Sequence, residues 1–251
     1  MQYKWIITVI IILALGGGWH YRHNLNLWWQ QQQLPPAVYR QTGNGLNNVE
    51  VQANLELAEQ AEPDNLPLQI NLAVPFMVQA PQANWSLPYQ EACEEAALIM
   101  AHYYKLKKEL DPVLADQEIQ KLVDWQNIHR DDYKDTTIAE TAAIAEEYWG
   151  DKAKIINHPT IDMIKQELAH GYPVIAPFYG RALGNQYYSG DGPLYHMLVI
   201  KGYFDDKFIT NDPGTKRGAD YVYDADIIMR AMHDWNGGQV ETGQAVIFVL
   251  K

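Results

Sequence analysis

The chain has almost no cysteine and comparatively little positive charge. Cys93 is the single cysteine among 251 residues, so it cannot form an internal disulfide and is a spectator, an intermolecular link or a reactive group. Lysine and arginine number 19 against 31 acidic residues, which gives a formal net charge of −12. This acidity argues against nucleic-acid binding, and against adhesion of the folded part to an anionic membrane surface, because both require basic patches.

Two further absences exclude other classes of protein. The sequence contains no cysteine and histidine cluster with zinc-binding spacing, and no glycine-rich phosphate loop follows a predicted strand. We therefore expect no metal, no nucleotide and no other cofactor.

One long apolar run stands at the N-terminus. The fifteen residues from Trp5 to Trp19 carry no charge, and as a helix they would span roughly 22 Å, less than a hydrocarbon core of about 30 Å. A cleaved signal peptide fits this length, although no Ala-x-Ala site ends the run. An uncleaved anchor fits the tryptophans at both ends, and we favour it. Residues 1–19 are thus predicted to be a transmembrane anchor or a signal peptide, with Lys4 inside and the remainder outside the cytoplasm, secreted if cleavage occurs.

Residues 20–65 are predicted to be a flexible tether. The segment contains the glutamine tract Gln30–Gln33, the pair Pro35-Pro36 and the turn-forming stretch Gln41–Asn48. From Leu66 onward the apolar pattern becomes regular, so residues 66–251 are predicted to form the folded domain.

The folded domain is predicted to be α+β. Residues 68–74 alternate between apolar and polar side chains and end at Pro75, which favours a short edge strand. Apolar groups three or four residues apart predict a helix over 91–109, and Thr137 with Glu140 forms a capping-box signature. Further helices are expected at 116–125, 137–149 and 160–170, followed by strands at 172–179, 196–203, 208–211 and 244–250. Helices first and strands afterwards indicate helices packed on a mostly antiparallel sheet.

Cys93 is predicted to lie at the start of the first of these helices. A helix N-terminus lowers the pKa of a thiol and can turn it into a nucleophile. Glu94 and Glu95 favour the helix terminus but oppose a thiolate, so a reactive Cys93 requires both carboxylates to point away from it. The alternative is that Cys93 is a small buried apolar residue.

His196 is the candidate partner for this thiol because it opens a predicted strand that returns through a hairpin. A carboxylate or amide at the end of the return strand can bind one imidazole nitrogen and leave the other free for the thiol. A two-residue loop at Asp205–Asp206 would put Asn211 on the same face as His196, whereas a three-residue loop would put Asp212 there. The alternative is that Asn211–Gly214 is an ordinary turn.

Acyl transfer also needs hydrogen-bond donors for the developing oxyanion. The backbone N–H of Cys93 is one candidate, and the side chains of Gln79, Gln82 and Gln90 are others.

Five segments of the chain, in this order, resemble the peptidase C39-like family of papain-fold cysteine peptidase relatives. They are Val74–Pro81, Gln90–Ala97, Gly171–Ile175, His196–Tyr203 and Asn211–Gly218. The resemblance covers roughly Leu66 to Lys251 and implies a papain-like cysteine peptidase fold.

The resemblance also implies roles for particular residues. The nucleophile of the family falls on Cys93, its general base on His196 and its orienting acid on Asp212, which favours the three-residue hairpin loop. Its oxyanion glutamine falls on Gln79. Cys93 lies fourteen positions after Gln79, a longer spacing than is usual in the family, so Gln90 remains a rival.

The leading hypothesis is a membrane-tethered, extracytoplasmic thiol hydrolase that cleaves a peptide or amide bond through a Cys-His-Asp triad. The alternative is a catalytically silent papain-like module that binds peptide or cell-wall partners. Tyrosines of the loop 181–195, namely Tyr187, Tyr188 and Tyr195, would serve either function by stacking on a ligand. A thiol acyltransferase is a third possibility and differs only in the acceptor that replaces water.

Overall fold

The computed structural model describes residues 30–39 and 66–251. The predicted anchor, residues 1–19, lies outside the described residues, as do residues 20–29 and 40–65 of the predicted tether. Within the described ranges, no helix has the length and apolar character needed to cross a membrane.

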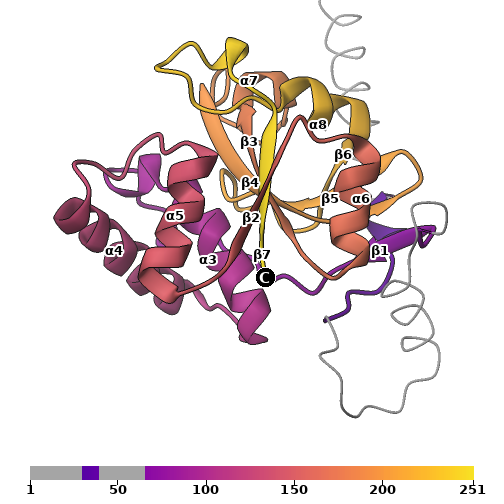
Figure 1. Cartoon of the computed structure of the whole chain (residues 1–251), viewed down its shortest axis with the longest axis horizontal. Helices are drawn as coiled ribbons and strands as arrows, with labels where there is room; N and C mark the ends of the chain where they lie inside the picture. The colour runs from indigo at the N-terminus through magenta and orange to yellow at the C-terminus, as the bar shows by residue number, and fades with distance from the viewer. Residues whose placement is uncertain (1–29, 40–65) are drawn as a thin grey trace, which may run out of the picture. The chain divides into compact units, whose positions relative to one another are not determined.

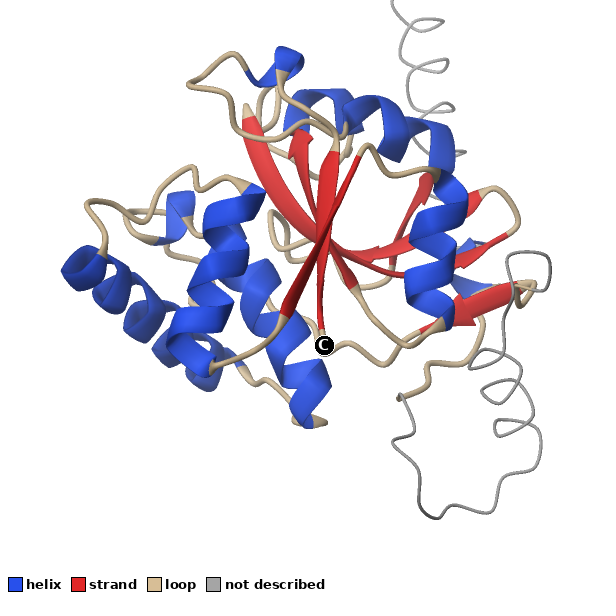
Figure 2. Cartoon of the chain, viewed as in Figure 1, coloured by secondary structure: helices blue, strands red, loops and turns tan. Residues whose placement is uncertain are grey.

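The centre of the fold is a seven-stranded sheet in which every strand pair is antiparallel (Figure 2). The strand order is β2-β7-β3-β4-β5-β6, and β1 pairs with β4. The strands are β1 (Gln69–Asn71), β2 (Ala153–Asn157), β3 (Val174–Tyr179), β4 (Tyr195–Phe204), β5 (Lys207–Asn211), β6 (Tyr221–Asp224) and β7 (Val246–Leu250). All ten residues of β4 are buried, because this strand pairs with β3, β5 and β1 and is covered by helices.

Helices pack around this sheet (Figure 1). They are α3 (Cys93–Leu106), α4 (Pro112–His129), α5 (Ile138–Trp149), α6 (Ile161–Ala169), α7 (Gly180–Leu183) and α8 (Ala225–Ala231), with single 3-10 turns η1 (Tyr89–Glu91) and η2 (Val240–Thr242). Helix α3 packs on β4 and also contacts α4 and α5. It is therefore enclosed, and twelve consecutive residues from its first position are buried. This arrangement places the N-terminus of α3 against the central strand.

The α+β class and the antiparallel sheet agree with the sequence prediction. Local signals located the helices well: Thr137 and Glu140 form the capping box of α5, and Thr160 caps α6. Strands β2 and β6 and helices α7 and α8 were not predicted from the sequence. Strand β2 lies between α5 and α6, so the expected order of helices first and strands afterwards is wrong at this point. It is an edge strand with three exposed residues, and its pattern lacks a clear apolar face.

Part of the predicted tether is docked on the domain. Val38 bridges Leu72, with hydrogen bonds from Val38 N to Asn71 O (2.8 Å) and from Ala73 N to Val38 O (2.7 Å). The ring of Tyr39 stacks on that of Tyr104, with 5.9 Å between centroids. Pro35–Lys251 form one compact unit, so residues 35–39 of the predicted tether group with the folded domain.

The hairpin between β4 and β5 corrects the predicted loop length. Phe204 pairs with Lys207, so the loop has two residues and not the expected three. A bulge between Ile200 and Gly202 then shifts the register by one residue, and Val199 pairs with Asn211. Because a shift of one residue exchanges the two faces of a strand, the bulge puts Asp212 on the His196 face despite the short loop.

Candidate active site

Cys93 is the first residue of α3 and is 6% exposed. The 3-10 turn η1 leads directly into the helix. The N-cap residue is Ala92, whose side chain cannot cap the first backbone N–H groups. The free backbone N–H groups of a first helical turn carry partial positive charge, which favours negative groups beside them. The sequence prediction therefore placed Cys93 correctly at a helix start.

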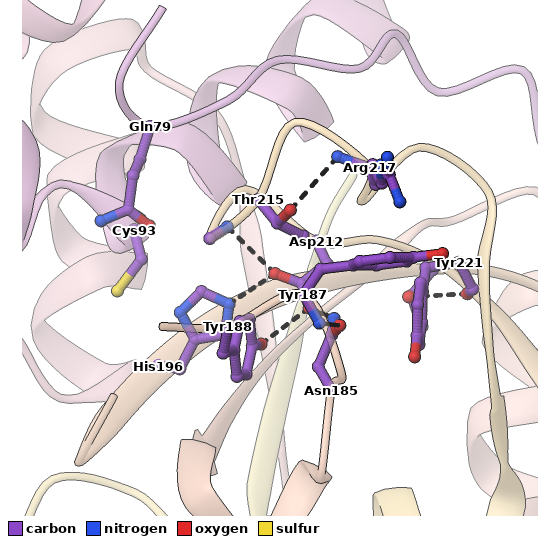
Figure 3. A network of polar contacts seen from close by, with 12 residues as sticks. Gln79, Cys93, Asn185, Tyr187, Tyr188, His196, Asp212, Thr215, Arg217 and Tyr221 are labelled. Carbon is purple, nitrogen blue, oxygen red and sulfur yellow. Dashed lines mark hydrogen bonds and ion pairs between the residues drawn. The ribbon is translucent and has the colours of Figure 1, made fainter. Parts of the chain in front are cut away.

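Gln79 binds the backbone of the segment that precedes α3. Its buried side-chain amide donates from Nε2 to the carbonyl oxygens of Tyr89 (3.0 Å) and Gln90 (3.1 Å). Its backbone N–H donates to Pro213 O (3.0 Å), on the loop that follows Asp212. Figure 3 shows the Gln79 side chain reaching toward Cys93.

Gln90, the other candidate oxyanion donor, points to the surface. The side chain of Gln90 is exposed, and its Nε2 donates to the carboxylate of Glu91 at 2.9 Å. Gln82 is exposed as well. Of the three glutamines considered, Gln79 is the buried one, and its side chain binds the backbone just before Cys93.

His196 and Asp212 form a buried pair at the β4–β5 side of the site. Nε2 of His196 lies 2.8 Å from Oδ1 of Asp212, and the two residues are 1% and 0% exposed. The other ring nitrogen, Nδ1, faces the sulfur of Cys93 (Figure 3). Asn211 is directed to different partners, since its Nδ2 donates to Val74 O and its Oδ1 accepts from the backbone of Asp220.

The carboxylate of Asp212 is saturated with hydrogen-bond donors. Besides His196, Oδ1 accepts the backbone N–H of Gly214 at 3.0 Å. Oδ2 accepts from Asn185 Nδ2 (3.0 Å), Tyr188 OH (2.7 Å) and Tyr223 OH (2.8 Å). Burial by itself would raise the pKa of Asp212, but the charge of His196 and these hydrogen bonds outweigh it and hold the pKa below its usual range. Asp212 is therefore ionised at every pH at which the protein is expected to work.

Glu94 does not point away from Cys93, contrary to the requirement set by the sequence. The Cys93 thiol donates to Oε2 of Glu94 at 3.0 Å, and Oε1 of Glu94 accepts the backbone N–H of Thr136 at 3.2 Å. Burial raises the pKa of the Cys93 thiol well above its usual value, and the charge of Glu94 raises it further, whereas the backbone N–H of Met197 lowers it. In this arrangement Cys93 is a neutral thiol, and the helix terminus does not outweigh burial.

The pKa values of Glu94 and Glu95 are raised as well. Burial, followed by the charge of Glu95, raises the pKa of Glu94 well above the usual range. Burial raises the pKa of Glu95 to about 7, although its hydrogen bond from Gln126 Nε2 (2.6 Å) opposes this. Glu95 thus binds Gln126 and not the thiol. Where Glu94 is protonated, it places no charge beside the sulfur.

The tyrosines predicted to stack on a ligand have other contacts. Tyr188 binds Asp212, and Tyr195 OH donates to the carbonyl oxygen of Thr136 at 2.9 Å. Asn185 and Tyr223 were not predicted as partners of Asp212, because no motif connects them to it and only the folded structure brings them to the carboxylate. Among the residues described here, no group of three metal-ligating side chains is placed to hold an ion.

Comparison with known proteins identifies the family. The sequence profile of the Peptidase_C39 like family matches residues 71–238. The chain belongs to this family. Membership supports a peptidase-like function with a peptide or protein substrate. No curated protein sequence matches the chain.

Two solved structures are similar to this member of the C39-like family. One is a C39-like peptidase from Bacillus anthracis, at 18% identity and a TM-score of 0.48, covering 74% of this chain and 98% of that one. The other is xylellain, a cysteine protease from Xylella fastidiosa, at 13% identity and a TM-score of 0.41, covering 87% of this chain and 99% of that one.

Proposed function

We propose that this chain is a cysteine-type hydrolase of peptide or amide bonds in which Cys93 is the nucleophile and His196 the general base. The observation that supports this most directly is the orientation of His196: Nε2 is bound to the ionised Asp212, and Nδ1 faces the sulfur (Figure 3). A carboxylate on one nitrogen fixes the tautomer, which leaves the other nitrogen free to accept the thiol proton.

The reaction would proceed in two stages. Nδ1 of His196 takes the proton of Cys93, the sulfur attacks the substrate carbonyl, and the imidazolium returns the proton to the departing amine. Water then attacks the thioester carbonyl and loses a proton to Nδ1. The C–S bond breaks, the carboxylic acid product leaves, and Nδ1 returns the proton to the sulfur. The backbone N–H of Cys93 and the amide of Gln79 are the donors proposed for the oxyanion. Nε2 of Gln79 already binds two carbonyl oxygens, so it would share a hydrogen with the substrate.

Glu94 sets the pH range in which this mechanism is favoured. An ionised Glu94 opposes the thiolate, while a protonated Glu94 can donate its proton to the sulfur at the same position. Since the pKa of Glu94 is raised well above the usual range, mildly acidic conditions leave it neutral. We therefore propose that the nucleophile is activated best on the acidic side of neutrality.

The thiol chemistry can be tested without a known substrate, because Cys93 is the only cysteine and every alkylation event reports on it. Iodoacetamide alkylation of the full chain would be followed by mass spectrometry between pH 5 and pH 9, with His196→Ala compared. We expect alkylation at pH 6 that is lost in His196→Ala. His170→Ala, which alters an exposed histidine, is the matched control and should behave as the wild type. Rates that follow an ordinary thiol pKa of about 8.5 in every protein would contradict the proposal.

A catalytically silent binding module is the second candidate. It is favoured by one observation: the hydrogen bond of Cys93 goes to Glu94, and burial raises the pKa of the thiol. Slow alkylation at every pH, in both wild type and His196→Ala, would support this function over the hydrolase.

We further propose that residues 1–19 anchor the protein in a membrane, with the folded domain outside the cytoplasm. The uncharged run between Trp5 and Trp19 supports this proposal. Membrane fractionation after an alkaline wash, with protease added to intact cells, would test it. Recovery of the intact chain in the soluble fraction, protected from the protease, would contradict it.

A further inference from the structure

The partners of Asp212 come from four separate parts of the fold. Asn185 and Tyr188 belong to the loop between α7 and β4, Tyr223 lies on β6, and the His196 and Gly214 contacts complete the set. The three side-chain donors all bind Oδ2, whereas His196 binds Oδ1. The carboxylate group is therefore held from both sides, and its rotation about the Cβ–Cγ bond is fixed.

A fully buried carboxylate without such donors would take up a proton instead of remaining charged. The titratable groups that face Asp212 are His196 on β4, Tyr188 on the loop, and Tyr223 and Tyr221 on β6. Burial raises the pKa values of the tyrosines, those of Tyr188 and Tyr223 well above 10, so their hydroxyl groups stay neutral and act as donors. A neutral donor supports the charge of Asp212 without competing with His196 for it.

We propose that Tyr188, together with Tyr223 and Asn185, positions the catalytic pair by holding Asp212 as an oriented anion for His196. The proposal rests on the hydrolase function argued above and assigns a role to three residues outside the triad. These are positioning residues, since none of them contacts the thiol.

Tyr188 carries this role most directly, because it contacts both members of the pair. Its hydroxyl binds Asp212, and its ring meets the His196 ring edge-on with 5.5 Å between centroids and an interplanar angle of 76°. Gly214 closes the same space: a Cβ there would lie 2.9 Å from His196 Cε1 and 3.1 Å from Tyr188 Cε1. The loop that the sequence assigned to ligand stacking thus points one of its tyrosines inward, onto the catalytic pair.

The test is the pH profile of Cys93 alkylation in full-length Tyr188→Phe, which keeps the ring and removes the hydroxyl. With one donor fewer on Oδ2, the Asp212 carboxylate is held less firmly against His196, so alkylation at pH 6, which depends on the oriented imidazole, should fall about tenfold. At pH 8 the thiol can lose its proton without this base, so the rate there should change least. Tyr187→Phe is the matched control, since the neighbouring tyrosine packs on Tyr221 and Arg217 and makes no hydrogen bond to Asp212. Loss of folded protein would instead expose Cys93 and give rates that follow an ordinary thiol pKa of about 8.5. A thermal unfolding curve would reveal such a loss.

A double-mutant cycle with Asp212→Asn shows whether the hydroxyl acts through Asp212. We expect that adding Tyr188→Phe to Asp212→Asn changes the profile little, because the charge that the hydroxyl supports is already absent. Tyr223→Phe should reproduce the Tyr188→Phe profile and provides a second variant if the first folds poorly. If His196→Ala abolishes alkylation at pH 6 but both phenylalanine variants match the wild type, the inference is overturned and the hydrolase proposal stands. If His196→Ala has no effect, the hydrolase proposal itself fails.

Discussion

Glu94, the residue that follows the proposed nucleophile Cys93, restrains its thiol. Glu94 is buried, 2% exposed, and its carboxylate both accepts the Cys93 thiol and is tied to the backbone of Thr136. A side chain held at two points cannot swing away without losing both contacts. The sequence showed the adjacency but not the direction of the side chain, which depends on a loop more than forty residues away along the chain.

Replacing Glu94 by glutamine should raise the reactivity of Cys93 at neutral and alkaline pH. The amide keeps a group of the same shape between the thiol and Thr136 but carries no charge, so the pKa of Cys93 should fall. We expect iodoacetamide alkylation at pH 8 to increase about tenfold or more, which corresponds to a fall of at least one pKa unit. Glu91→Gln is the control, because it also removes a nearby charge but has no hydrogen bond to the thiol. Equal rates in wild type and Glu94→Gln would show that this charge does not restrain the thiol.

The hairpin of β4 and β5 delivers Asp212 to His196 through a bulge. With a two-residue loop and regular pairing, Asn211 would face His196, as the sequence analysis recognised. The bulge inserts one extra residue into β4, which has the same effect on the register as a three-residue loop. Gly202 directly follows the bulged position, and β1 crosses closely there: a Cβ on Gly202 would lie 2.2 Å from Ile70 O and 2.9 Å from Asn71 Cα.

Gly202→Ala should therefore destabilise the protein strongly, because β1 would have to separate from β4. We expect a loss of unfolding free energy of about 2 kcal/mol or more, measured by chemical denaturation. Gly190→Ala is the matched control: its Cβ meets nothing within 4 Å, and only its φ of +58° is unfavourable, so it should cost about 1 kcal/mol. Equal losses in the two variants would contradict the close approach at β1.

Elements with local signals were predictable, and elements defined by pairing were not. Three helices were predicted from signals that act within one or two turns. These signals are the capping box of Thr137 and Glu140, the cap residue Thr160, and the apolar spacing after Cys93. Strand β2 is recognised only through its partner β7, and the bulge at Lys201 only through the register of two strands. For the same reason the His196–Asp212 pair could be proposed from a resemblance, but the donors on Oδ2 could not.

At the scale of the whole molecule, burial of two adjacent carboxyl groups makes stability depend on pH. The pKa of Glu95 is raised from 4.5 to about 7 by burial, so the folded protein binds this proton more tightly than the unfolded chain. The stabilisation is complete below pH 4.5 and is lost as the pH rises through about 7, a loss on the order of 3 kcal/mol.

Glu95→Gln should remove this part of the pH dependence. The difference in unfolding free energy between variant and wild type should move in favour of the variant as the pH rises from 5 to 8. Glu147→Gln, at an exposed position on α5, is the control and should show a constant difference from the wild type. A constant difference for Glu95→Gln as well would mean that the folded and unfolded states hold this proton equally.

The docked segment, residues 35–39, should also contribute to the stability of the folded protein. Residues 35–39 add two backbone hydrogen bonds at Val38, one from Asn71 Nδ2 to Pro35 O, and the stacking of Tyr39 on Tyr104. A chain that begins at Leu66 should be less stable than one that begins at Pro35 by about 2 kcal/mol. Denaturation midpoints of the two chains would measure this, and equal midpoints would show that the segment adds nothing.

The contact between Cys93 and Glu94 also affects how readily peroxides oxidise the thiol. Peroxides attack the thiolate of a cysteine and not the neutral thiol, and exposure increases the rate. The resting sulfur is neutral and 6% exposed, so it should react slowly with such oxidants. The chain has no second cysteine to trap a sulfenic acid as a disulfide, and an oxidised Cys93 would have no repair within the molecule. Burial and the Glu94 carboxyl, which both raise the pKa of the Cys93 thiol, thus also keep the sulfur reduced.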